Sequence, residues 1–315
     1  ACKEIFLFDD FDEMKAYFEA FWPDIFGPNI EDSKRFGTSR ARNALTDFER
    51  CLITLMRLNM RYMRHSDLAL IWDTSKKTVA RCLKEWAPRL RKIGNQLSIL
   101  DVPEEYLNES CPQSFLDANL MNVGGLVDRK VIMTDENRKN SALKGGAWSD
   151  KVHHGGVTFL QFCLPNGLIF EHSPTVLGTA SEDMCVRHMG LNSTPLVVEV
   201  KQPDGSIQEV KFDRRLGKVR AGKVMLTDRG FATHAKFYPN KNFHIFPAFL
   251  SGREQFTSTE RQRDNPLCKL RWVNEANFAR LLYVSSLCDV VRSAFIPYIP
   301  CAVSWGFAMS NLQQP

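Results

Sequence analysis

The spacing of apolar residues changes partway along this 315-residue chain. Between Thr46 and about residue 100, apolar side chains recur every three or four residues, which is the period of an amphipathic helix. From Gly124 onward they come in short runs of strand length, separated by turn-forming residues. The change predicts an all-α segment followed by a mixed α/β domain with flanking helices.

Three helices are expected in the all-α segment. Each begins after a hydroxyl side chain that can accept a hydrogen bond from the first turn of the helix. Thr46 precedes a helix that runs to about Met63, and Glu49 completes a capping box with it. Ser66 precedes the helix Asp67–Trp72, and Ser75 precedes the third helix. In the third helix Val79, Leu83 and Trp86 face inward. The exposed face is basic and carries Lys76, Lys77, Arg81 and Lys84.

A short helix, a tight turn and a basic helix together predict a helix-turn-helix that binds double-stranded DNA. Its last helix would enter the major groove while the basic side chains neutralise phosphates. The net charge of +5 is compatible with this partner, because residues 33–100 are rich in Lys and Arg whereas residues 1–32 are rich in acids. The alternative is a plain helical bundle with a solvated basic face.

The predicted domains follow from these changes. Residues 1–45 hold an amphipathic helix, Phe8–Phe26, and a basic linker, and residues 46–100 form the helix-turn-helix. Residues 101–122 connect this domain to the α/β domain, which covers residues 123–315 and has a hairpin insertion near 192–223. The chain starts at Ala1, so a truncated N-terminus is also compatible with the sequence.

The α/β domain is expected to contain two hairpins. The predicted elements in chain order are a strand Leu126–Thr134, a hairpin of Val157–Leu164 and Leu168–His172 around Pro165-Asn166-Gly167, a helix Ser181–Met189, a hairpin of Pro195–Val200 and Ile207–Phe212, a strand Val224–Thr227 and a helix Trp272–Leu287.

Three acids lie on these elements at unusual places. Asp128 is in the middle of a strand, Asp228 ends another, and Glu275 falls on the same helical stripe as Phe278. Carboxylates rarely face inward without a partner, and hard divalent cations prefer oxygen ligands. If the two strands are neighbours, the acids could converge on a metal ion. By spacing alone, a strand-end cap, a turn residue or a salt bridge explains each acid better than a metal ligand does.

Other residue classes exclude alternatives. Nine cysteines without a Cys-x-x-Cys pair fit reduced thiols and argue against a disulfide framework or a zinc ribbon. Cys163, Cys185 and Cys288 lie in apolar runs and are expected to be small core residues. No apolar run approaches the roughly 18 residues that span a bilayer, so a membrane protein is not expected.

The order of several short motifs resembles that of the Harbinger-like transposases, a branch of the DDE superfamily. The resemblance rests on Val127-Asp128, Trp148-Ser149-Asp150-Lys151, Phe159-Leu160, Leu164-Pro165-Asn166-Gly167, Gly178 with Ser181-Glu182-Asp183, Leu226-Thr227-Asp228-Arg229-Gly230-Phe231, and Arg271-x-x-x-Glu275-x-x-x-x-Arg280. The helix-turn-helix extends the likeness upstream to about Thr46.

The resemblance implies an RNase H-like nuclease domain behind a helix-turn-helix, in a nuclear protein that cuts transposon ends and transfers the strand to target DNA. It implies that Asp128, Asp228 and Glu275 are catalytic and hold Mg²⁺ or Mn²⁺, with two ions expected. Further candidates for contacting DNA or orienting the acids are Trp148, Ser149, Lys151 and Arg229. A homo-oligomeric assembly is left open.

Two departures from the family pattern keep alternatives open. The connection over Asn192 to Lys223, with its hairpin, is longer than the usual one. Arg129 and Lys130 replace the small residue and the Thr that usually follow the first acid, and two cations there would compete with a metal for Asp128. A domesticated DNA-binding protein that lost cleavage is therefore one alternative, and a hydrolase of small phosphate esters is another. Asp135 is a rival first acid, but its odd spacing from Asp128 places it on the opposite strand face.

Overall fold

The structure is a computed structural model. It describes residues 45–60, 63–100, 102–135, 145–182, 184–185, 196–201, 207–212, 223–231, 243–283, 287 and 290–312. The chain divides into two compact units: residues 1–98 with 279–313 and 315, and residues 99–278 with 314. The boundary at residue 98 lies close to the expected end of the helical domain, whereas the C-terminal residues group with the helices. The expected helix Phe8–Phe26 and the basic linker lie outside the described residues.

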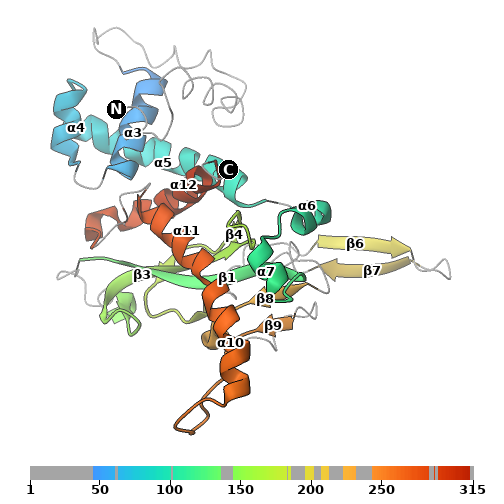
Figure 1. The fold of residues 1–315 in the computed structure, drawn as a ribbon. Coiled ribbons are helices and arrows are strands. Elements are labelled where there is room, and N and C mark those ends of the chain that lie inside the picture. The colour runs from blue at the N-terminus through green and yellow to red at the C-terminus, as the bar shows by residue number, and fades with distance from the viewer. Residues whose placement is uncertain are drawn as a thin grey trace. The chain divides into compact units, whose positions relative to one another are not determined.

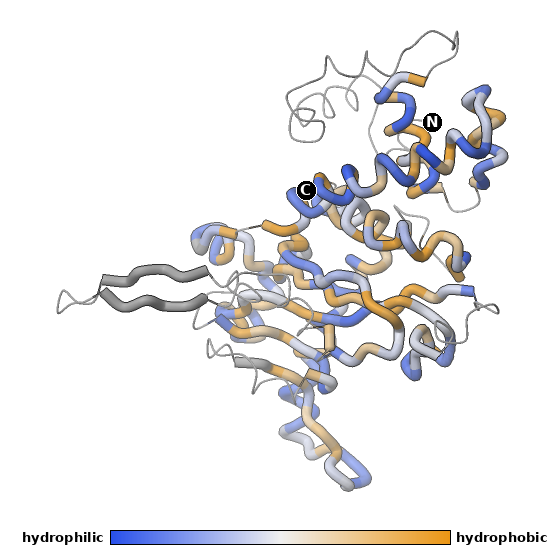
Figure 2. Tube along the Cα trace, turned by 180° about the vertical axis from the view of Figure 1, so that it is seen from behind, coloured by the Kyte–Doolittle hydropathy of each residue, from blue (hydrophilic) through white to orange (hydrophobic). Residues whose placement is uncertain are grey.

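The first unit is helical (Figure 1). Its elements are α3 (Asp47–Asn59), α4 (His65–Ile71), α5 (Lys76–Ser98), a short 3-10 helix η4 (Ser293–Tyr298) and α12 (Ile299–Leu312). Figure 2 shows hydrophobic and hydrophilic residues alternating along α3 and α5, as expected for amphipathic helices. No helix of the described residues is both long enough and apolar enough to cross a membrane.

The predicted helix starts are confirmed at two of three places. The Thr46 hydroxyl accepts the Glu49 backbone N–H at 3.2 Å, and Glu49 accepts the Thr46 N–H, which is the expected capping box. Ser75 accepts the Thr78 N–H at 3.1 Å. Ser66 was expected to cap α4 but lies inside its first turn, because the Asp67 carboxylate accepts the backbone N–H of the actual cap, Arg64, at 2.8 Å.

Helix α5 continues through Pro88 to Ser98. A proline inside a helix removes one backbone hydrogen bond, so another contribution must compensate. That contribution is burial: Leu90, Ile93 and Gly94 continue the apolar face along which α12 packs. The basic residues of α5 are exposed as predicted, namely Lys76, Lys77, Arg81 and Lys84.

The second unit contains a mixed sheet with flanking helices, as the change in periodicity predicted. The sheet is formed by β1 (Val123–Met133), β2 (Trp148–Ser149), β3 (His154–Cys163), β4 (Ile169–His172), β5 (Val176–Leu177), β8 (Val224–Leu226) and β9 (Phe243–Ile245). The strand order is β2-β3-β1-β8-β9, and β4 and β5 also pair with β3. Strand β1 is antiparallel to β3 and parallel to β8, and β8 is parallel to β9.

The helices of this unit are α6 (Glu104–Glu109), α7 (Gln113–Asp117), the 3-10 helix η2 (Arg229–Phe231), α10 (Ser258–Leu270) and the first part of α11 (Trp272–Tyr283), whose residues from 279 onward group with the first unit. Both predicted hairpins are confirmed. The first is β3 with β4, and Gly167 in its turn has the positive φ of 95° that glycine tolerates. The second is β6 (Leu196–Lys201) with β7 (Ile207–Phe212), a separate two-stranded sheet. Most of the expected helix Ser181–Met189 lies outside the described residues.

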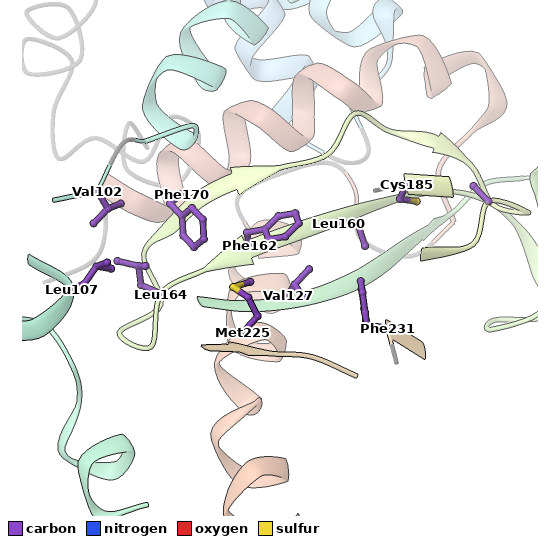
Figure 3. Close-up of a cluster of buried hydrophobic side chains, with 11 residues drawn as sticks. Val102, Leu107, Val127, Leu160, Phe162, Leu164, Phe170, Cys185, Met225 and Phe231 are labelled. Atoms are coloured by element: carbon purple, nitrogen blue, oxygen red, sulfur yellow. The ribbon is translucent and has the colours of Figure 1, made fainter. Parts of the chain in front are cut away.

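The two faces of the main sheet differ. One face packs on a buried apolar cluster that includes Val127, Leu160 and Phe162 (Figure 3). Asp128 alternates with Val127 along β1 and therefore points to the other face. On that face Phe159 meets Phe278 of α11 edge to face, with ring centroids 6.2 Å apart. The sheet and α11 together therefore determine the surroundings of Asp128.

Candidate functional site

Two of the three candidate acids lie at the same level of neighbouring strands. Leu126 of β1 is the register partner of Leu226 of β8, and the two strands run parallel. Asp128 and Asp228 each follow two residues later. The condition on which convergence depended, that the two strands be neighbours, is thus fulfilled.

Arg271 contacts both aspartates. Its Nη2 lies 3.7 Å from Oδ2 of Asp128, and its Nη1 lies 3.7 Å from Oδ1 of Asp228. Each aspartate also accepts the backbone N–H of the next residue, Arg129 at 2.7 Å and Arg229 at 2.6 Å. The two carboxylates are therefore oriented by backbone donors and share one guanidinium.

The two aspartates differ in exposure. The side chain of Asp128 is only 8% exposed, whereas that of Asp228 is 47% exposed. Burial raises the pKa of Asp128 above its ordinary value, and the positive charges of Lys151 and Arg271 oppose that rise. The nearby cations therefore do not fully compensate the cost of burying this carboxylate.

Glu275 does not face the sheet, so its expected inward position is wrong. Its side chain is exposed, whereas Asn274 and Phe278 are buried. The buried face of α11 is rotated relative to the apolar stripe that was predicted from residue spacing, because the polar Asn274 is part of it. The amide oxygen of Asn274 accepts a hydrogen bond from the Cys163 thiol at 3.1 Å. Glu275 lies one turn beyond Arg271, on the flank of α11, and its role as a ligand stays a prediction.

The two cations that follow Asp128 are engaged elsewhere. Arg129 points to the opposite strand face, where its Nε lies 2.9 Å from Glu182 and its Nη1 donates to the Ala180 carbonyl at 2.7 Å. The ammonium group of Lys130 lies 5.4 Å from the centre of the Phe278 ring. The expected competition of Arg129 for Asp128 is therefore wrong, because strand alternation separates the two side chains.

A buried polar row crosses the sheet beside Asp128, and no sequence pattern indicated it. Gln161 of β3 is the register partner of Asp128, and His172 of β4 is the register partner of Gln161. Gln161 is fully buried, and neither its amide oxygen nor its amide nitrogen has a hydrogen-bond partner within the described part of the chain. Pairing this residue with Asp128 requires the strand register, which periodicity alone does not supply.

The secondary candidates occupy different environments. Lys151 donates to the Arg129 carbonyl at 3.1 Å, and the Arg229 guanidinium lies 5.2 Å from the centre of the Phe256 ring. Trp148 is exposed and donates to Asp150 at 3.0 Å. Ser149 is 1% exposed, so it cannot reach DNA in this conformation, and its hydroxyl makes no hydrogen bond within the described residues.

The remaining candidates are also placed. Asp135 is exposed and follows the end of β1, away from the carboxylate pair. Cys163 and Cys185 are buried, as expected for small core residues, whereas Cys288 lies outside the described residues. The geometry thus favours Asp128 as the first acid of the site.

Two of the three expected ligands, Asp128 and Asp228, are placed where they could bind a hard divalent cation. Asp128 and Asp228 supply carboxylate oxygens, the ligand type that Mg²⁺ and Mn²⁺ prefer, and the guanidinium shows that a positive charge is accommodated beside both. Within the described residues no group of three or more His, Cys, Asp or Glu side chains is close enough to hold a metal ion.

Comparison with known proteins gives one match. Residues 127–284 match the model of a family described as DDE superfamily endonuclease. The matched stretch is about half of the 315-residue chain and contains Asp128, Asp228 and Glu275. Neither a curated protein nor a solved structure matches the chain.

Proposed function

The chain belongs to the DDE superfamily endonuclease family, and on that premise we propose that it is a transposase-like, metal-dependent DNA endonuclease and strand transferase. The order of its motifs further supports the Harbinger-like branch, and the mixed sheet supports an RNase H-like domain. The substrate is then double-stranded DNA at transposon ends, and the site of action is the nucleus.

One observation carries the proposal: Asp128 of β1 and Asp228, two residues beyond the end of the neighbouring parallel strand β8, share the Arg271 guanidinium. A bound Mg²⁺ or Mn²⁺ would activate a water molecule and stabilise the leaving oxygen of a phosphodiester. Asp128 and Asp228 would hold it. Backbone N–H groups fix one oxygen of each carboxylate, so the site is partly organised before the cation binds.

The charges around the pair suit a DNA backbone. Lys151 and Arg229 lie beside the first and second acids, and their cationic groups could contact the phosphates on either side of the bond to be cut. Exposed Trp148 could contact the sugar or a base. In the helical unit, the exposed basic face of α5 would provide separate binding to the duplex.

The test is cleavage of supercoiled plasmid by the full chain in Mg²⁺ or Mn²⁺. We expect D228N to lower cleavage by orders of magnitude, because it removes a ligand charge, and excess chelator to abolish cleavage. Ca²⁺ should bind without supporting turnover, because its coordination geometry is looser. The control is E254Q, an exposed acid outside the site. Wild-type cleavage by D228N would refute the nuclease proposal.

Glu275 is tested in the same assay. If the Glu275 side chain moves toward the two aspartates and binds the cation as the third ligand, E275Q should lose cleavage by orders of magnitude. The Tm of E275Q without metal should equal that of the wild type, because the side chain is exposed. An E275Q protein that cuts normally would remove Glu275 from the site and leave the two aspartates in place.

The exposed position of Glu275 also favours one alternative. A domesticated protein would keep the fold and the DNA-binding helices but not cleavage, and it would not need Glu275 near Asp128 and Asp228. Retention of duplex binding in a protein that shows no cleavage with any divalent cation would support this second function.

A further inference from the structure

The Arg271 guanidinium is placed where a site for divalent cations needs positive charge. It approaches one oxygen of Asp128 and one of Asp228, at 3.7 Å each. These distances exceed the roughly 2.7–2.9 Å of a charge-assisted hydrogen bond. Its Nε is buried and makes no hydrogen bond within the described part of the chain. Arg271 is thus held mainly by charge, without the directed bonds of a tight fork.

The carboxylates are more firmly held than the cation. Oδ1 of Asp128 and Oδ1 of Asp228 accept backbone N–H groups at 2.7 and 2.6 Å, so both aspartates have partners that do not depend on Arg271. Arg271 lies at the junction of α10 and α11, and its side chain is 18% exposed. A change of side-chain rotamer toward solvent would remove the guanidinium and leave the two carboxylates oriented.

We infer that Arg271 is an internal counter-ion, which neutralises Asp128 and Asp228 in the metal-free protein. A divalent cation must displace the Arg271 guanidinium in order to bind these aspartates. The inference rests on the proposed function, since it assumes that these aspartates bind the cation. Two carboxylates close together repel each other, and a tethered guanidinium removes that repulsion before metal arrives. The same contact opposes metal binding, because the cation must break it. Arg271 therefore sets the metal affinity of the site.

The test is direct titration of chelator-treated protein with Mn²⁺, followed by the electron paramagnetic resonance of free Mn²⁺, together with Tm in chelator. We expect R271Q to bind Mn²⁺ several-fold to about tenfold more tightly, since tenfold corresponds to about 1.4 kcal/mol, a plausible size for two loose ion pairs. Its Tm without metal should be lower. The control is K269Q, which removes an exposed charge from the end of α10 and should change neither quantity.

R271K provides an independent variant in case R271Q does not fold. A lysine has one charged nitrogen in place of a planar fork and cannot contact both carboxylates equally, so R271K should bind Mn²⁺ more tightly than the wild type. Unchanged affinity would overturn the counter-ion role and leave the metal site intact. Weaker binding would also overturn it, because Arg271 would then help to orient the ligands. If neither wild type nor variants bind Mn²⁺, the proposed metal site fails, and the inference fails with it.

Discussion

At the scale of single residues, the strand register decides which polar groups meet. Asp128 is opposite Gln161 in the sheet and within 3.7 Å of Arg271, although these residues are far apart in the sequence. Arg129, its immediate neighbour in sequence, points to the other face and pairs with Glu182. A charge next to an acid in the sequence is therefore a poor guide to the charge that compensates it in the fold.

The raised pKa of Asp128 predicts a pH dependence of stability. The folded protein holds this proton more tightly than the unfolded chain does, so the associated stability is complete below the ordinary value of 3.8. It is lost as the pH rises from 3.8 through the folded-state pKa. Because D128N stays neutral, wild type should lose stability relative to D128N across this window, by about 1.4 kcal/mol for each tenfold difference in proton affinity.

The measurement is Tm against pH in excess chelator for wild type, D128N and the exposed control E254Q. The control should follow the wild type throughout. A wild-type protein that gains stability relative to D128N as the pH rises would show that Lys151 and Arg271 outweigh the cost of burial.

At the scale of elements, buried faces decide where helices continue. Helix α5 passes through Pro88 because its apolar face is covered beyond that point, whereas its first turns carry the exposed basic side chains. Helix α11 buries Asn274 and Phe278 and leaves Glu275 on its flank. In both helices one face packs against other elements and another is exposed.

If the basic face of α5 binds DNA, its charges should appear in the salt dependence. Each phosphate contact removed should reduce the slope of log K against log salt by roughly one, so K77A and R81A should each weaken duplex binding and lower the slope. The matched control is K92A, on the same helix but outside the predicted contact set. Binding isotherms at several salt concentrations give the slopes. Unchanged slopes for Lys76, Lys77, Arg81 and Lys84 variants would refute the DNA-binding role of α5.

At the scale of the whole molecule, the helical unit is built from both ends of the chain. The backbone of α5 at Gly94 closely approaches that of α12 at Ser304, and Asn311 donates to the Leu97 carbonyl at 3.1 Å. The fully buried Trp305 and Phe307 belong to α12. The helices predicted as an autonomous domain over residues 46–100 therefore depend on C-terminal residues for part of their core.

Gly94→Ala tests this dependence. A methyl group at Gly94 would lie 2.6 Å from the Ser304 carbonyl carbon, and backbone cannot yield as a flexible side chain can. Overpacking should cost about 1–3 kcal/mol, although alanine favours a helix by about 1 kcal/mol over glycine. We expect a net loss of stability in chemical denaturation. Gly145→Ala is the control, since nothing lies within 4 Å of its added methyl group, and it should be neutral or stabilising. Equal effects would refute the close helix contact.

The local elements of this protein follow from its sequence. Capping at Thr46 and Ser75, the turn at Gly167 and the alternation along β1 depend on residues close together in the chain, so pattern and propensity predict them. Asp128 and Asp228 could be chosen as candidates for the same reason, because one lies in the middle of a predicted strand and the other at the end of one.

Which of these elements contact each other became visible in the three-dimensional fold. The pairing of β1 with β8, the guanidinium shared by Asp128 and Asp228, and the packing of α12 on α5 join residues far apart in sequence. Glu275 shows the same limit at one position. A helical stripe gives the relative angle of side chains but not the face that packing will bury, and here the polar Asn274 rather than Glu275 faces the sheet.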